Sequence, residues 1–278
     1  MKTMKKFIIA AALLLAGFAT ASAQKIKGSD TVLPLSQKEA EEYMKVNPSA
    51  TVTVTGGGSG VGISALMEGT TDIAQASRRM KFDEKQKIQK EGDKVKETVV
   101  AYDALAVVVH PSNPVTNLTR EQLEGIFTGR ITNWKEVGGP DENIVLVTRP
   151  TSSGTRATFQ KYALDGNEEA SNTSMETDDS GVLLQNVKDT KGAIGYVALS
   201  YLTGDAGVAT VAIDGAEPTL ENTYAGKYPV WTFEHMYTKG EPDEVVSAFL
   251  DYIMSDEYGA KMESLGYGVS SKMTNTEH

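Results

Sequence analysis

Cysteine is absent from the 278-residue chain, and histidine occurs only at His110, His235 and His278. Without a thiol, the chain can form neither a disulfide nor a cysteine nucleophile. Three scattered histidines leave little material for a histidine metal site or a Ser-His-Asp triad. The composition therefore argues against a hydrolase, and we expect no enzymatic activity, no metal and no cofactor.

Long apolar runs are also lacking, except at the N-terminus. Lys2, Lys5 and Lys6 precede the apolar stretch 7–18, and Ala-Ser-Ala at 21–23 matches the A-x-A cleavage pattern of secretory signal peptides. The apolar stretch is shorter than the ~20 residues that a membrane-spanning helix needs. We therefore expect residues 1–23 to be a signal peptide cleaved after Ala23, and the remaining chain to be a soluble periplasmic protein.

Positive charge is in deficit, because 27 Lys and Arg against 37 Asp and Glu give a formal net charge of −10. Nucleic acid and anionic membrane surfaces repel such a chain, so neither is an expected partner. An anion site must then depend on local dipoles and hydrogen bonds, against an unfavourable overall field. The length suits two domains of ordinary size.

Three turns rich in glycine and hydroxyl residues each precede a predicted helix. The most complete is the stretch 149–156, Arg-Pro-Thr-Ser-Ser-Gly-Thr-Arg, between an apolar strand at 144–147 and a helix at 157–163. The first amides of a helix lack intrahelical acceptors and lie at the positive end of its dipole, so they bind anions well. Small Ser and Gly side chains let an anion approach those amides.

The other two turns lie nearer the N-terminus. Residues 28–35 lead into an amphipathic helix at 36–47, and a β-branched strand at 50–55 runs into the Gly/Ser turn 56–63, which opens a helix at 61–68. The second turn has no Lys for a Walker A loop, and its spacing fits neither G-x-G-x-x-G nor the G-x-S-x-G elbow. Helix capping explains one such turn, but three such turns together favour a binding site for a small, multiply charged oxyanion between two lobes.

Charged residues occur at two further predicted strands. A strand at 73–76 ends at Ser77 and Arg78, and ligands of open α/β sheets bind at that end of parallel strands. Asp103 interrupts the apolar strand 98–109, where a carboxylate is costly unless it is paired or faces a ligand. The remaining predicted elements are helices at 119–127, 181–187, 243–254 and 255–265, a strand at 192–197 and a charged helical segment at 82–96.

The chain resembles the phosphate-binding proteins of bacterial phosphate ABC transporters in six stretches spread over its length: 28–32, 56–62, 72–78, 103–109, 125–134 and 149–155. The resemblance implies an α/β, two-lobed periplasmic-binding-protein fold (type II), whose two α/β domains are joined by two crossover strands. Lobe 1 would comprise 25–108 and 199–278, and lobe 2 would comprise 109–198. The resemblance also implies a monomer that binds inorganic phosphate in the inter-lobe cleft with high affinity and delivers it to the membrane permease subunits of an ABC transporter.

By motif position, the resemblance implies that amides and hydroxyls from both lobes hold the phosphate together with one arginine. Arg149 would supply a charge-assisted contact, a role that suits the planar fork of Arg better than the point charge of Lys. The other donors would be Ser29, Thr31, Val32, Ser59, Gly60, Ser77, Ser153, Gly154 and Thr155.

One position departs from the family pattern. Where the best-known branch carries an Asp that accepts the phosphate proton, this chain has Arg78. Phosphate near neutral pH carries a proton and sulfate does not, so a buried carboxylate acceptor favours phosphate. We therefore expect Asp103, or in second place Asp30, to accept the proton, with Arg78 either binding phosphate or neutralising Asp103.

Three other functions stay open at the level of sequence. The same fold could carry sulfate, molybdate or another oxyanion, although a carboxylate in the pocket argues against fully deprotonated anions. A secreted phosphatase or esterase would need an activated nucleophile or a metal, and no motif for either is present. A structural or adhesive role would leave the three anion-type turns unexplained.

Overall fold

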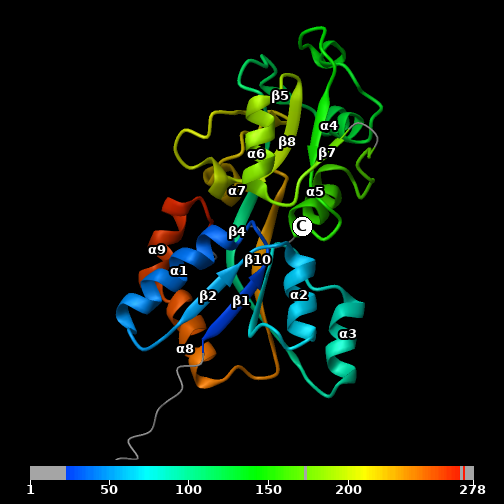
Figure 1. Ribbon diagram of the computed structural model, residues 1–278. Helices are drawn as coiled ribbons and strands as arrows, with labels where there is room; N and C mark the ends of the chain where they lie inside the picture. The colour runs from blue at the N-terminus through cyan, green and yellow to red at the C-terminus, as the bar shows by residue number, and fades with distance from the viewer. Residues whose placement is uncertain (1–22, 172–173, 270–271, 273–278) are drawn as a thin grey trace, which may run out of the picture.

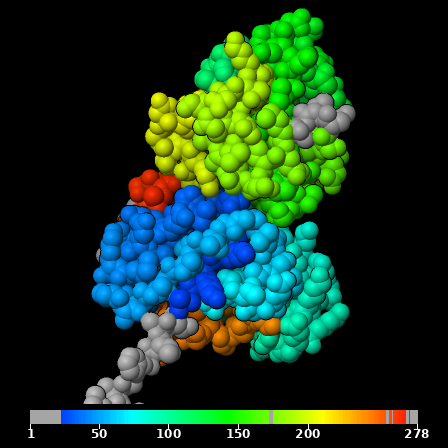
Figure 2. Space-filling view, viewed as in Figure 1, coloured from blue at the N-terminus to red at the C-terminus, as the bar shows by residue number. Residues whose placement is uncertain are grey.

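The computed structural model describes residues 23–171, 174–269 and 272, so the predicted signal peptide lies outside the described residues except for Ala23. The chain forms two α/β lobes, one above the other in Figure 1, with β4 (Val95–Val109) and β10 (Trp231–Lys239) running between them. In the space-filling view the lobes are two masses that meet along a narrow zone (Figure 2). The predicted two-lobed α/β fold with two crossover strands is therefore confirmed.

Lobe 1 is the lower lobe in Figure 1, and its sheet has the strand order β2-β1-β3-β10-β4. The three short strands pair in parallel, and β10 pairs antiparallel with β3 and β4. Helices cover both faces, because α1 and α8 bury apolar residues against one face and α2 and α3 against the other. The other elements of this lobe are β1 (Gln24–Gly28), α1 (Leu33–Val46), β2 (Val52–Thr55), α2 (Ser59–Met67), β3 (Ile73–Ala76), α3 (Phe82–Lys90), α8 (Glu244–Ile253), α9 (Asp256–Met262) and the 3-10 turn η3 (Glu263–Leu265).

Lobe 2 continues from the C-terminal part of β4, which pairs antiparallel with β8 and β9, while β6 lies in parallel between β8 and β7. Its largest core cluster contains Phe127, Phe159 and Tyr196, whose rings pack together. The other elements of this lobe are β5 (Asn117–Leu118), α4 (Arg120–Phe127), η1 (Trp134–Val137), β6 (Val145–Thr148), α5 (Gly154–Ala163), β7 (Ser174–Glu176), α6 (Ser180–Asp189), β8 (Ala193–Ala198), η2 (Leu199–Leu202), β9 (Ala209–Ile213) and α7 (Leu220–Tyr224).

Strand pairing bears on where one lobe ends and the other begins. Ala104 still pairs with Trp231 of β10, whereas Leu105 already pairs with Ala198 of β8. In addition, β9 pairs with β4 and β5 and so belongs to lobe 2. The boundaries 108/109 and 198/199 stay predictions, and this pairing favours crossing points near Ala104 and Val230 instead.

Most predicted elements lie within a few residues of the observed ones. The strand at 73–76 is β3, and the helices expected at 119–127, 181–187 and 243–254 are α4, α6 and α8. Neither β9 nor the long strand β10 was predicted from the sequence. Within the described part of the chain, no helix combines the length and the hydropathy that a bilayer crossing requires.

Candidate functional site

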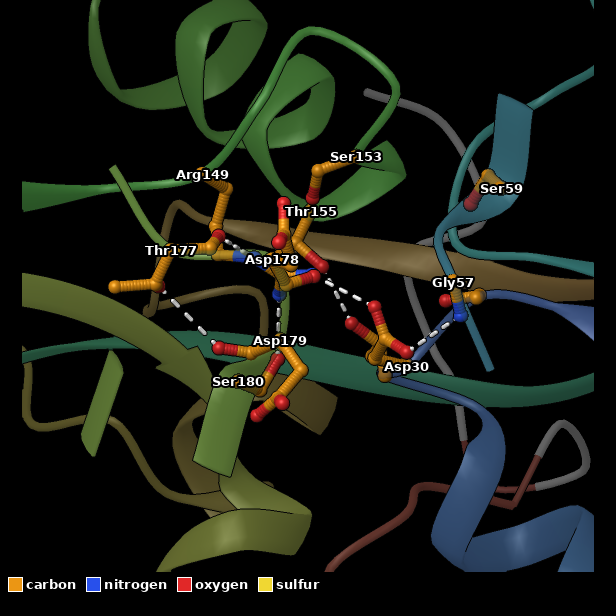
Figure 3. A network of polar contacts seen from close by, with 12 residues as sticks. Asp30, Gly57, Ser59, Arg149, Ser153, Thr155, Thr177, Asp178, Asp179 and Ser180 are labelled. Carbon is orange, nitrogen blue, oxygen red and sulfur yellow. Dashed lines mark hydrogen bonds and ion pairs between the residues drawn. The ribbon is translucent and has the colours of Figure 1, made fainter. Parts of the chain in front are cut away.

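Three helix starts, each following a parallel strand, meet where the lobes touch (Figure 3). The Thr31 hydroxyl before α1 lies 2.5 Å from the Thr155 hydroxyl in the first turn of α5. The Gly60 amide in α2 donates to the Ser152 carbonyl across the lobes at 3.0 Å. A Cβ built on Gly154 would overlap the Ser59 hydroxyl, so the two lobes approach too closely there for any side chain. The three predicted anion-type turns are thus brought to one place.

A chain of buried hydroxyls lines the lobe 1 side of this place. Ser29 Oγ donates to Ser77 Oγ at 2.9 Å, and Ser77 Oγ lies 3.3 Å from Ser59 Oγ. The Ser77 amide donates to Ser59 Oγ at 3.0 Å, which fixes the end of β3 against the start of α2. From lobe 2, Thr158 of α5 donates its hydroxyl to the Ser77 carbonyl at 2.9 Å. Every one of these side chains is buried.

Several backbone amides at these helix starts have no acceptor among the described residues. Four of them belong to buried residues at the place where the lobes meet, namely Thr31 and Ser59 of lobe 1 and Gly154 and Thr155 of lobe 2. Buried amides without a partner are rare in folded proteins, and each costs about 1–3 kcal/mol. Four of them gathered where two lobes meet indicate a site for an anionic acceptor.

Arg149 is the cation of the site, and its side chain is only 1% exposed. The side chain leaves the end of β6 and donates Nε to the Thr177 carbonyl and Nη1 to Ser180 Oγ, at 3.1 and 2.7 Å. Its Nη2 donates to the Asp178 carbonyl and to Asp30 Oδ2, both at 2.7 Å. These contacts use four of the five N–H groups of a guanidinium, which leaves one on Nη1.

Asp30 is the carboxylate of the site and is 5% exposed. Besides its ion pair with Arg149, its Oδ1 accepts the Gly57 amide at 2.9 Å. Gly57 and Gly58 have φ angles of 115° and 94°, which only glycine adopts readily, so the turn that presents this amide depends on glycine. Tyr201 of η2 also donates its hydroxyl to the Asp30 carbonyl at 2.7 Å. Asp30 therefore connects both lobes.

Arg78 and Asp103 lie outside this group of contacts. Arg78 donates twice to Glu84 in the first turn of α3, at 2.8 and 2.9 Å. Asp103 is buried in β4 and accepts the Leu199 amide at 3.2 Å. Burial raises the pKa of Asp103 well above its usual range. The structure thus pairs each residue locally and gives no contact between them.

The structure brings together most of the predicted residues and adds others. Ser153 caps α5 by accepting the Arg156 amide, and the Val32 amide donates to Ser29 Oγ at 3.4 Å. The additional contributors are Gly57, Ser152, Arg156, Thr158, Thr177, Ser180 and Tyr201. Helical spacing could have identified Thr158, because it lies three residues after Thr155 on the same face of α5.

Comparison with known proteins agrees with this geometry. A family model described as "PBP superfamily domain" matches residues 16–257. The phosphate-binding protein PstS of Bacillus subtilis (strain 168) is 44% identical over 235 residues, which cover 84% of this chain and 75% of that protein. This chain belongs to the PstS phosphate-binding protein family of the PBP superfamily. The resemblance inferred from the six stretches is thereby confirmed.

Solved structures of this family have the same fold. A putative phosphate ABC transporter substrate-binding protein from Clostridium perfringens, solved with bound phosphate, superposes with a TM-score of 0.82 at 36% identity and covers 89% of this chain and 99% of that one. An ABC-type phosphate transport receptor from Vibrio cholerae gives a TM-score of 0.71 at 34% identity, covering 88% and 99% of the two chains. The PstS protein of Borreliella burgdorferi is 32% identical over 251 residues, 87% of this chain and 88% of that protein.

Proposed function

We propose that this protein binds inorganic phosphate between its lobes and delivers it to the permease of a phosphate ABC transporter. The observation that carries the proposal is the set of four unpartnered buried amides, which come from both lobes and lie beside the buried cation Arg149. The names of its relatives point to the same ligand and transporter class. As an exported carrier it would act in the periplasm after cleavage behind Ala23, and as a monomer.

Phosphate would replace contacts that the site residues now make with one another. The Thr31–Thr155 and Ser29–Ser77 hydroxyl pairs each hold donors that can turn toward an oxyanion. The free amides of Gly154 and Thr155 would add the positive end of the α5 dipole, and Arg149 has one N–H left. Such a site neutralises the anion with hydrogen bonds from both lobes, so binding the anion favours the closed form.

Discrimination against sulfate requires an acceptor for the phosphate proton, and we assign that role to Asp30. Asp30 is the carboxylate in contact with the site, whereas Asp103 accepts an amide in the crossover strand. Each oxygen of Asp30 takes one donor, and a carboxylate oxygen has capacity for a second. Sulfate would leave that capacity unused and would place two unprotonated anions side by side.

We further propose that the protein binds phosphate without turnover. A serine or threonine nucleophile needs an adjacent base. In the described residues, the site hydroxyls of Ser59 and Ser77 bond to each other, and His235 lies in β10 beside Glu97. Release of nitrophenol from a phosphate ester at a steady rate would contradict this proposal.

Calorimetric titration of the phosphate-stripped protein tests the central proposal. We expect tight one-to-one binding of phosphate and no heat with sulfate under the same conditions. Equal binding of both ions would assign the protein to general oxyanion transport, and binding of neither would mean that the three turns are ordinary helix caps.

A further inference from the structure

The turn 149–156 contains the lobe 2 residues that we expect to donate to the anion. One residue of this turn, Arg156, makes hydrogen bonds to two other points of it. Arg156 donates its Nη1 to the Arg149 carbonyl at 2.7 Å, and its amide donates to Ser153 Oγ at 3.3 Å. Arg149 is the first residue of the turn and Ser153 is the N-cap of α5. Both ends of the donor-bearing segment are therefore fixed to Arg156.

We propose that Arg156 is a positioning residue, which sets the phosphate affinity through the Arg149–Thr155 turn without touching the anion. This inference rests on the proposed function. The guanidinium of Arg149 reaches the cleft from a backbone whose carbonyl Arg156 holds. The Gly154 and Thr155 amides follow directly from the N-cap that the Arg156 amide completes.

Carboxylates on neighbouring segments of lobe 2 surround the guanidinium of Arg156. Three carboxylates lie within 4 Å: Glu169 and Glu176 at 3.5 Å and Glu168 at 3.9 Å. Glu169 is itself buried and accepts the Tyr196 hydroxyl at 2.8 Å. Tyr196 stacks on Phe159 in the core of lobe 2. A continuous set of contacts thus runs from the aromatic core through Glu169 and Arg156 to the Arg149 carbonyl.

Arginine suits this position better than lysine. Its planar fork reaches the Arg149 carbonyl with Nη1 while Nε faces Glu169, two directions that one ammonium group cannot serve in the same geometry. Removing the guanidinium leaves a buried Glu169 without its cation and an untied carbonyl at Arg149. Both effects should make the position of the turn 149–156 less well defined, and neither changes the residues of lobe 1.

Calorimetric phosphate titration of the stripped full chain tests the proposal with Arg156→Gln and Arg156→Lys. We expect phosphate affinity to fall by about 10- to 100-fold in Arg156→Gln, the range for a lost charge-assisted hydrogen bond, and by less in Arg156→Lys. Arg120→Gln is the matched control, because exposed Arg120 also donates to one backbone carbonyl, that of Tyr162 at the other end of α5. We expect its affinity to stay within about twofold of the wild type.

A double-mutant cycle separates positioning from a general effect on folding. Combined with Arg149→Lys, the loss from Arg156→Lys should be clearly smaller than the sum of the two single losses, because both act through one turn. Combined with Ser59→Ala of lobe 1, the losses should add. Unchanged affinity in both Arg156 variants, or additive losses with Arg149→Lys, would overturn the proposal. Failure of the wild type to bind phosphate would instead overturn the proposed function.

Discussion

Asp30 and Asp103 are both buried carboxyl groups, but their surroundings differ. Asp30 pairs with Arg149 of the other lobe at 2.7 Å, so an opposite charge compensates it. Asp103 lies in β4 on the same face as Glu234 of β10, and in the described residues neither carboxyl group has an ion pair. Burial raises the pKa of both Asp103 and Glu234 well above the usual range, and their mutual repulsion adds to the shift of Glu234.

The difference separates two ways of burying an acid. At the cleft, the compensating charge belongs to the other lobe, so closing the lobes is what pairs Asp30 with its cation. In the crossover strands no cation compensates the acids, and burial favours their neutral, protonated forms instead. The first arrangement responds to lobe movement and the second to pH, and substitutions can test each one separately.

The largest effect should follow from Arg149→Gln, which leaves Asp30 buried without its cation. Breaking a buried ion pair on one side costs about 3–5 kcal/mol, so we expect phosphate affinity to fall by about a thousandfold or more. Calorimetric titration measures the loss. Arg130→Gln is the control, because Arg130 pairs with Glu124 on the surface of lobe 2. Retained affinity in Arg149→Gln would mean that the anion is held by amides and hydroxyls alone.

Asp30→Asn and Asp103→Asn should differ in selectivity. Asn at position 30 can donate to sulfate, so we expect the preference for phosphate over sulfate to fall by about a hundredfold. Asp103→Asn should keep the wild-type preference, because Asp103 faces the Leu199 amide. Competition titrations with both ions give the ratio. The reverse result would return the acceptor role to Asp103, which was the first choice from the sequence.

Glu234→Gln should change the pH dependence of stability and leave phosphate binding intact. A carboxyl group whose pKa is raised on folding stabilises the protein fully below its unfolded pKa, and this contribution is lost as pH rises toward the folded pKa. The free energy of unfolding of the wild type should therefore fall between pH 5 and pH 8. In Glu234→Gln the fall should be smaller than in the wild type, as measured by urea denaturation at several pH values.

The control for this experiment is Glu217→Gln, at an exposed loop position. It should reproduce the wild-type pH dependence. If Glu234→Gln did the same, protons would not be what neutralises the pair in the crossover strands.

Glu39→Gln should show a smaller effect of the same sign. Glu39 of α1 is fully buried, neither of its oxygens has a hydrogen-bond partner in the described residues, and desolvation raises its pKa to about 8. The substitution should remove at most about 4 kcal/mol of the stability lost between pH 5 and pH 8, because the pKa rises from 4.5 to about 8 on burial. Glu42→Gln, on the same helix, is the control. Its lysine partners lower the pKa of Glu42 to about 2, so its contribution changes only in acid.

The sequence predicted the site best where local chemistry determines it. The turns at Thr31, Ser59 and Thr155 could be recognised because capping hydroxyls, glycines and helix starts are all short-range features. The sequence could not show that Arg78 would contact Glu84 in the next helix, because motif position does not show which way an arginine turns. Asp103 was placed correctly in a buried strand, but the sequence could not show that the Leu199 amide would meet it.

The strands β9 and β10 were missed for a different reason. The sequence of β10 contains Glu234 and His235 in its interior, and polar residues at such positions do not indicate a fully buried strand. Both residues are buried because β10 lies between β3 and β4, a tertiary arrangement that no short window contains. The strand β9 was missed for the same reason, because its partners β4 and β5 lie far away in the sequence.

Gly154 gives the closed state a mechanical limit. Because Ser59 and Ser77 occupy the space that a side chain at position 154 would need, even one methyl group there would act as a wedge between the lobes. Gly154→Ala would thus keep the two lobes from closing fully, although it removes no hydroxyl and no charged group from the site. The absence of a side chain at Gly154 therefore determines how closely the two lobes can approach each other, as much as any hydrogen-bond donor of the site does.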